Sequence, residues 1–229
     1  MLDKNIRQSI IALIQREVVP AVGCTEPIAV ALCTARATET LGQRPEKITA
    51  MLSANILKNA MGVGIPGTGM IGLPIAIALG AIVGRSDYEL EVIKDVTPET
   101  LEEGKAYVEE KRIDIRLKAD ITEKLYIDVV CEAAGHKAEA VISGSHTNFV
   151  YISRDGETLL DVKNTGCEDG DNGDPELCMR TVYDFATTTP VDEIAFILKT
   201  RQYNLKAAEE SVKGNFGHCL GKTIDRPLS

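Results

Sequence analysis

The stretch from Ile113 to Ile152 decides the fold, and it reads IDIRLKADITEKLYIDVVCEAAGHKAEAVISGSHTNFVYI. Apolar and polar residues alternate strictly in Ile113-Asp114-Ile115-Arg116-Leu117, which is typical of a half-buried strand. Three more strands are predicted here, at residues 125–132, 138–142 and 149–152. With an acidic helix predicted at 98–111, they indicate a compact α+β unit, for which a split βαβ arrangement is one interpretation.

Helical patterns lie on both sides of this unit. Asp3 is a predicted N-cap for the first helix, Thr25 is a predicted N-cap for a second helix that stops at Gly42, and apolar periodicity returns after Leu177. Helix is also predicted from Met70 to Val83, and short strands at residues 47–53 and 90–93. The sequence therefore predicts an α+β fold in which a mostly helical domain is interrupted by an α+β domain. The helical domain would comprise residues 1–86 and 163–229, and the inserted domain residues 87–162.

Composition excludes two kinds of partner. The 229 residues are 44% hydrophobic and 26% charged, the ordinary globular mixture. A formal charge of -9 would repel phosphate, and 4% aromatic residues leave little for base stacking, so we expect no nucleic-acid partner. Residues 60–84 carry no charge, but their glycines and prolines leave an apolar helix too short to cross a bilayer. We therefore expect no membrane partner either.

The cysteines indicate a reducing compartment. All six are separated by at least eight other residues, so no CxxC pair predicts a local zinc or redox site. No signal peptide is recognisable at the first residues, and a chain of this length can build a core without disulfides. We expect free thiols in the cytoplasm.

The strongest chemical signal is Gly23-Cys24-Thr25-Glu26-Pro27. Cys24 lies just ahead of a predicted helix, whose free N–H groups and dipole favour the thiolate, the form that binds metal or attacks an electrophile. The alternative is that Cys24 is a small buried apolar residue, the commonest fate of a free cysteine.

Two further polar motifs follow along the chain. Asn55, Lys58 and Asn59 lead into the glycine-rich segment 64–69, whose backbone N–H groups could hold a carboxylate. Lys58 would add a positive charge, or a base if desolvated. The alternative is a turn that only lets the next helix pack. The other motif is the polar segment 143–148 at a strand end, which could orient a polar substrate or transfer a proton, or could be an exposed turn.

Together these motifs resemble the L-cysteine desulfidase family, which is related to iron-sulfur L-serine dehydratases. The resemblance rests on Gly-Cys-Thr-Glu-Pro at 23–27, Lys-Asn-Ala-Met-Gly-Val-Gly-Ile-Pro-Gly-Thr-Gly at 58–69 and Ser-His-Thr-Asn at 145–148, in that order. It implies a lyase with a [4Fe-4S] cluster, held by three cysteines, that eliminates sulfide from L-cysteine and yields pyruvate and ammonia. An open iron position would act as a Lewis acid.

The resemblance also implies roles for individual residues. Cys24 corresponds to the first cluster ligand, and Lys58 and His146 are the two candidates for the base. The substrate-binding candidates are Thr25, Glu26, Asn55, Asn59, Gly67, Thr68, Ser145, Thr147 and Asn148. A small amino acid is the expected partner.

One departure from the family limits this assignment. Family members are considerably longer, and their remaining cluster cysteines lie in a second half that this sequence lacks. We therefore expect an N-terminal portion that cannot form the cluster alone, with uncovered apolar surface that could favour a homo-oligomer. An L-serine dehydratase-type ammonia-lyase and a catalytically inactive amino-acid-binding module remain the alternatives.

Overall fold

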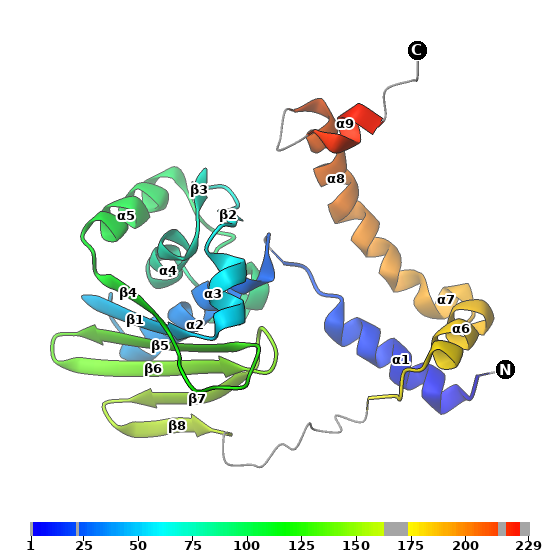
Figure 1. The fold of residues 1–229 in the computed structure, drawn as a ribbon, viewed down its shortest axis with the longest axis horizontal. Helices are drawn as coiled ribbons and strands as arrows, with labels where there is room; N and C mark the ends of the chain where they lie inside the picture. Colours follow the sequence, from blue (N-terminus) through cyan, green and yellow to red (C-terminus); the bar gives the residue numbers. More distant parts are fainter. Residues whose placement is uncertain (1, 22, 163–173, 215–218, 225–229) are drawn as a thin grey trace. The chain divides into compact units, whose positions relative to one another are not determined.

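The computed structural model describes the chain except for residues 1, 22, 163–173, 215–218 and 225–229 (Figure 1). The chain divides into two compact units. The first, called the sheet unit here, is Pro20–Asp169. The second, called the helical unit, combines Met1–Val19 with Gly170–Ser229.

The sheet unit is built on a six-stranded sheet with the order β4-β1-β5-β6-β7-β8 (Figure 1). β1 and β4 are parallel, and all other neighbours are antiparallel. The strands are β1 (Lys47–Leu52), β4 (Ile113–Leu117), β5 (Tyr126–Ala133), β6 (His136–Ser143), β7 (Phe149–Arg154) and β8 (Glu157–Asp161).

Helix α2 forms the centre of the core of this unit. It packs against β5 and β6 and also against α4, and its side chains at Ile28 and Leu32 are fully buried. The two helices approach closely, because a Cβ atom added to Gly80 of α4 would lie 2.5 Å from the carbonyl oxygen of Ala31 in α2. The helices are α2 (Thr25–Leu41), α3 (Ala54–Ala60), α4 (Leu73–Ile82), the 3-10 helix η1 (Ser86–Glu91) and α5 (Pro98–Glu109), and the short strands β2 (Gly64–Ile65) and β3 (Met70–Ile71) form a hairpin.

The predicted α+β class is confirmed, as are the helix at 98–111 and the strands at 47–53, 113–117, 125–132, 138–142 and 149–152, within a few residues at their ends. The strand predicted at 90–93 is wrong. Its first two residues, Leu90 and Glu91, lie in the 3-10 helix η1, and Val92 and Ile93 lie in the turn that follows it. The helix predicted from Met70 begins at Leu73 instead, because Met70 pairs in the hairpin and Gly72 turns the chain with a φ of 91°.

The chain is divided differently from the expected inserted domain. β1 lies between β4 and β5, so residues 47–52 belong to the same sheet as the strands after residue 112. The parallel β1 and β4 are joined through three α-helices, so the parallel connection starts at β1, before the residues 87–162 in which a split βαβ arrangement was expected. A boundary at residue 87 would cut this sheet from its own core helices.

The helical unit consists of α1 (Lys4–Glu17), α6 (Met179–Thr188), α7 (Val191–Ile194), the 3-10 helix η2 (Ala195–Leu198), α8 (Lys199–Lys213) and α9 (Leu220–Ile224). The predicted N-cap is confirmed, since the Asp3 carboxylate accepts a hydrogen bond from the backbone N–H of Asn5 at 2.8 Å. Arg7 of α1 forms an ion pair with Glu193 of α7 at 3.1 Å. Among the residues described, no helix is long and apolar enough to cross a membrane.

Candidate functional site

The three polar motifs come together in the sheet unit around the first turn of α2. The Glu26 carboxylate accepts a hydrogen bond from the Asn59 side-chain amide at 3.2 Å. His146, from the third motif, contributes a smaller electrostatic effect that lowers the pKa of the Glu26 carboxyl. The third link is between loops, because Gly23 lies directly against the ring of Pro66. Segments far apart in the sequence thus form one polar cluster, defined here as Cys24, Glu26, Asn59 and His146.

Cys24 is the N-cap residue of α2, and Thr25 is the first helical residue, so the prediction of Thr25 as the N-cap is wrong. The half-buried Cys24 thiol makes no capping hydrogen bond but donates to Glu26 Oε2 at 2.9 Å. Burial and this hydrogen bond raise the pKa of the thiol above its ordinary value. This direction of the pKa shift is opposite to the expected preference for thiolate, because burial and the neighbouring carboxylate outweigh the helix dipole.

Glu26 is the centre of the polar cluster. Its Oε2 also accepts a longer hydrogen bond of 3.4 Å from the Thr25 hydroxyl. The hydrogen bond from Cys24 is the largest cause that lowers the pKa of Glu26, with smaller contributions from Asn59 and His146. Glu26 is consequently a fixed negative charge at neutral pH, although the sequence motifs placed it only among the substrate-binding candidates.

The glycine-rich loop is shaped by Gly23 and Thr68. Gly23 has a φ of +80°, and a Cβ atom there would lie 2.6 Å from Pro66 Cγ, so any side chain would separate the two motifs. The buried Thr68 hydroxyl donates to the carbonyl of Ile65 at 2.6 Å and accepts from the N–H of Met70 at 2.9 Å. Thr68 thus maintains the turn. Gly67 lies at its open side, because a Cβ atom added there would meet no atom beyond its chain neighbours within 4 Å.

The remaining predicted site residues belong to the same motifs and are exposed or half-buried. Asn55, Lys58 and Ser145 are exposed, and Thr147 is half-buried like His146. The exposed Asn148 donates from its side-chain amide to the carbonyl of Ser143 at 2.9 Å, which closes the turn that carries His146.

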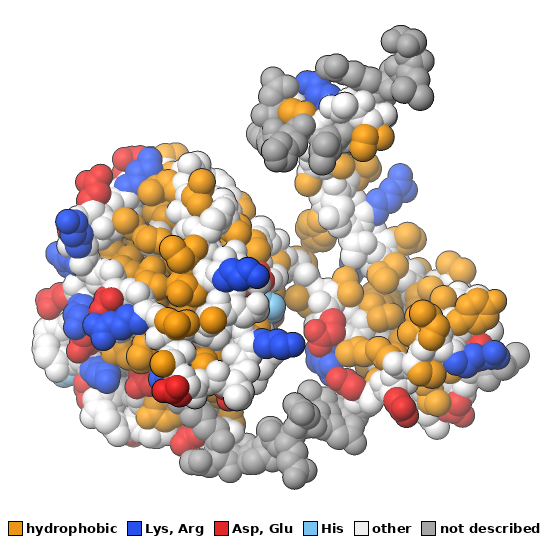
Figure 2. All heavy atoms as spheres, viewed as in Figure 1, with side chains coloured by type: hydrophobic (Ala, Val, Ile, Leu, Met, Phe, Trp, Pro, Cys, Tyr) orange, Lys and Arg blue, Asp and Glu red, His pale blue; other side chains and the backbone are white. Residues whose placement is uncertain are grey.

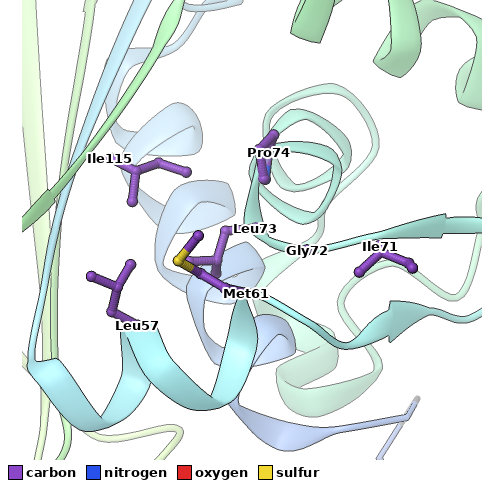
Figure 3. A pocket seen from close by; sticks show the side chains of 7 residues that line it. All are labelled: Leu57, Met61, Ile71, Gly72, Leu73, Pro74 and Ile115. Atoms are coloured by element: carbon purple, nitrogen blue, oxygen red, sulfur yellow. The ribbon is translucent and has the colours of Figure 1, made fainter.

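An apolar hollow lies beside α3 and was not predicted (Figure 3). Its lining residues are Leu57, Met61, Ile71, Gly72, Leu73, Pro74 and Ile115. Leu57 of α3 and Met61, the C-cap residue of this helix, are four residues apart, and this spacing is the sequence signal that could have located the hollow. Its side chains are all apolar, so a zwitterionic amino acid would lose hydration there without gaining partners. The polar cluster is therefore the better candidate for an amino-acid site.

The two core cysteines of the sheet unit do not complete a metal site with Cys24. Cys33 and Cys131 are buried in the core, where Cys33 donates to the carbonyl of Ala140 at 3.1 Å and burial raises the pKa of Cys131 to about 12. No group of three or more His, Cys, Asp or Glu side chains is placed to hold a metal ion within the described part of the chain. Cys167 lies outside the described residues. Within the described part of the sheet unit, a cluster that needs three cysteines would therefore find one thiol at this site, that of Cys24.

The geometry defines an α+β protein with a Cys-Glu-Asn-His cluster, and its sequence is similar to proteins named UPF0597. It is 66% identical over 223 residues to a UPF0597 protein of Bacteroides fragilis, and the alignment covers 97% of this chain and 52% of that protein. A UPF0597 protein of Phocaeicola vulgatus is 62% identical, with 98% and 52% covered. One from Aeromonas hydrophila is 39% identical, with 95% and 51% covered.

The chain thus spans about half the length of the curated relatives it matches, and their names state no activity. No protein-family model and no solved structure matches the chain.

Proposed function

We propose that this chain is the N-terminal part of a lyase that eliminates sulfide from L-cysteine to give pyruvate and ammonia. The observation that supports this proposal is that Cys24 and Asn59, from two separate motifs, both donate hydrogen bonds to the Glu26 carboxylate, while His146 of the third motif acts on its pKa electrostatically. These motifs are the ones on which the resemblance to the L-cysteine desulfidases rests.

The polar cluster offers complementary groups for a zwitterion. Glu26 supplies a fixed negative charge for the substrate ammonium, in a half-buried position where the attraction is less screened than at the surface. The turn around Gly67, with its open side, supplies backbone N–H groups for the carboxylate. The side chains of Asn59 and Thr147 lie within the motifs that would orient the substrate between these two ends.

The chemistry requires removal of the α-proton of cysteine and loss of the β-sulfur. A base takes the proton, the electron pair of the C–H bond forms the C=C bond, and the C–S pair leaves with sulfur as sulfide. The aminoacrylate then takes up water and releases ammonia and pyruvate. His146 and Lys58 are the candidates for the base; His146 interacts electrostatically with Glu26, whereas Lys58 is exposed on α3.

The iron-sulfur cluster needs ligands beyond the described residues. Cys24 would hold one iron, which requires that its proton leave the hydrogen bond to Glu26. When bound, a [4Fe-4S] group with an open iron supplies Lewis-acid chemistry. The free thiols of the described residues also fit a reducing cytoplasm, where we place the protein.

The test uses this chain joined to the remaining sequence of the Bacteroides fragilis relative, prepared anaerobically. We expect sulfide and pyruvate in equal amounts from L-cysteine. Cys24→Ser should lower the rate by at least ~100-fold, as expected for loss of a reacting-centre ligand, whereas the matched control Cys178→Ser, at an exposed cysteine of the helical unit, should retain activity.

Other outcomes distinguish the alternatives. Pyruvate from L-serine, with none from L-cysteine, would indicate a serine dehydratase. Calorimetric binding of cysteine without any product, in protein with a full iron content, would indicate a binding module. Equal activity of the two serine variants would refute the role assigned to Cys24.

A further inference from the structure

The helices that follow the sheet unit leave their apolar faces uncovered. No residue of α6, α7, η2 or α8 is buried. The most exposed of their large apolar side chains and of α9 are 63% to 84% accessible, namely Met179, Tyr183, Val191, Leu198, Tyr203 and Ile224. Figure 2 shows apolar side chains gathered over α6 and α7.

These side chains follow helical spacing instead of being scattered. In α6, Met179, Val182 and Tyr183 are separated by three and four residues, which places them on one face of the helix. All three are exposed. α6 has only 10 residues, and an isolated helix shorter than about 12 to 15 residues is marginal in water. A helix this short with a continuous apolar face is therefore expected to be stabilised by a partner that covers this face.

The sheet unit offers little to cover them. Its core is closed around α2, and its exposed large apolar side chains, among the residues described, are few: Met61, Ile71, Leu117, Leu159 and Val162. The curated relatives, in contrast, contain about as much chain again beyond the aligned region, since the alignment covers 52% of their length. That additional polypeptide is large enough to supply a second core.

We infer that the apolar faces of α6, α7 and α8 are the docking surface for the half of the relatives' polypeptide that this chain does not contain. The helical unit would then be the first part of a second domain, completed only by the other half. This inference depends on the exposed apolar side chains of these helices and on the length of the relatives beyond the aligned region. It does not depend on the proposed reaction.

The experiment co-expresses this chain with the unaligned half of the Bacteroides fragilis relative as a separate polypeptide. Analytical ultracentrifugation gives the stoichiometry and dissociation constant, and hydrogen exchange with mass spectrometry reports each helix. We expect a 1:1 complex in which amides of α6 and α8 exchange at least 10-fold more slowly than in the chain alone. Amides of β5 and β6 serve as the internal folding control and should not change.

Two substitutions in α6 test the face itself. Met179→Lys and Tyr183→Lys should each weaken the complex at least 10-fold, because each places a charge in the apolar contact while Lys retains good helix propensity. Thr188→Lys is the matched control, since it lies nine residues from Met179 and thus on the opposite face of the helix. We expect it to change the dissociation constant less than twofold.

Three results would overturn the inference. A dimer of this chain alone with α6 protected would show that a second copy covers the face. A monomer with α6 and α8 already protected would show that the sheet unit covers it. Failure to form a complex while β5 and β6 remain protected would show that the other half does not bind there.

Discussion

Helices α2 and α8 are nearly equal in length, with 17 and 15 residues, but eleven residues of α2 are buried and none of α8. α8 is rich in Lys, Ala and Glu, which favour helix intrinsically, whereas α2 contains several β-branched residues that do not. The helix with the weaker propensity is therefore the one that tertiary packing supports. Core packing thus stabilises the sheet unit, whereas local interactions stabilise the helical unit.

The largest expected effect comes from removing core volume in α2. Leu32→Ala should lower the free energy of unfolding by about 3 kcal/mol, because Leu32 is fully buried and a cavity would remain. Leu205→Ala in α8 is the matched control at 44% exposure, and should cost less than about 0.5 kcal/mol. Urea unfolding followed by circular dichroism measures both. Equal losses of unfolding free energy in the two variants would contradict the conclusion that core packing stabilises only the sheet unit.

A glycine-to-alanine pair should give opposite signs in the two units. Gly80→Ala should destabilise by about 2 kcal/mol, because the new methyl group would meet the backbone of Ala31. Gly221→Ala in α9 has open space around it and should stabilise that helix by about 0.5 to 1 kcal/mol. Thermal and urea unfolding measure the change in stability caused by Gly80→Ala. Hydrogen exchange of the α9 amides measures the effect of Gly221→Ala. A stabilising Gly80→Ala would refute the close contact of α2 and α4.

Loss of the cap at Asp3 should have a smaller and more local effect. Asp3→Ala should destabilise α1 by about 1 kcal/mol, since the N–H groups of Asn5 and Ile6 lose their acceptor. Asp3→Asn keeps an acceptor and serves as the control. We expect faster amide exchange in α1 for the alanine variant only. Faster exchange that also spreads into β5 would contradict the local character of helical-unit stability.

The smallest effect on stability is expected for a substitution of Glu26. Its main effect should be on the reactivity of the Cys24 thiol. Glu26→Gln removes the negative charge beside Cys24, so the pKa of the thiol should fall and its alkylation at neutral pH should become faster. The rate-against-pH profile for the Cys24 peptide, followed by mass spectrometry, should therefore move to lower pH. Glu46→Gln, at a carboxylate outside the polar cluster, should leave the profile in place. A shift to higher pH would mean that Glu26 does not hold the thiol proton.

Local signals in the sequence were sufficient for most of the secondary structure. Alternation located β4 and β5, and the cap residues located the start of α1 and the end of α2 at Gly42, which has a left-handed φ of 79°. Local signals failed at η1, where Leu90 and Val92 are buried by tertiary packing without forming a strand. Local signals also could not predict the strand order, because β1 pairs with strands that lie more than sixty residues later in the sequence.

In the candidate site, too, the sequence predicted which residues are present but not which of them are in contact. The motifs identified Cys24, Asn59 and His146 as chemically capable groups, but the hydrogen bond from Asn59 to Glu26 joins residues 33 apart in sequence. That contact depends on how α3 is placed against α2, which no local pattern encodes. The protonation of the Cys24 thiol follows from its burial and from the Glu26 carboxylate beside it, whereas the helix dipole alone predicts the opposite sign.

The position of β1 between β4 and β5 has a consequence for synthesis on the ribosome. β1 ends at Leu52, and its second neighbour is complete only at Ala133. At about 5 to 20 residues per second, the nascent chain waits on the order of 4 to 16 seconds between these points. Throughout this interval the apolar side chains of α2 have no sheet to cover them. We therefore expect the apolar face of α2 to stay exposed on the nascent chain until β5 has been synthesised.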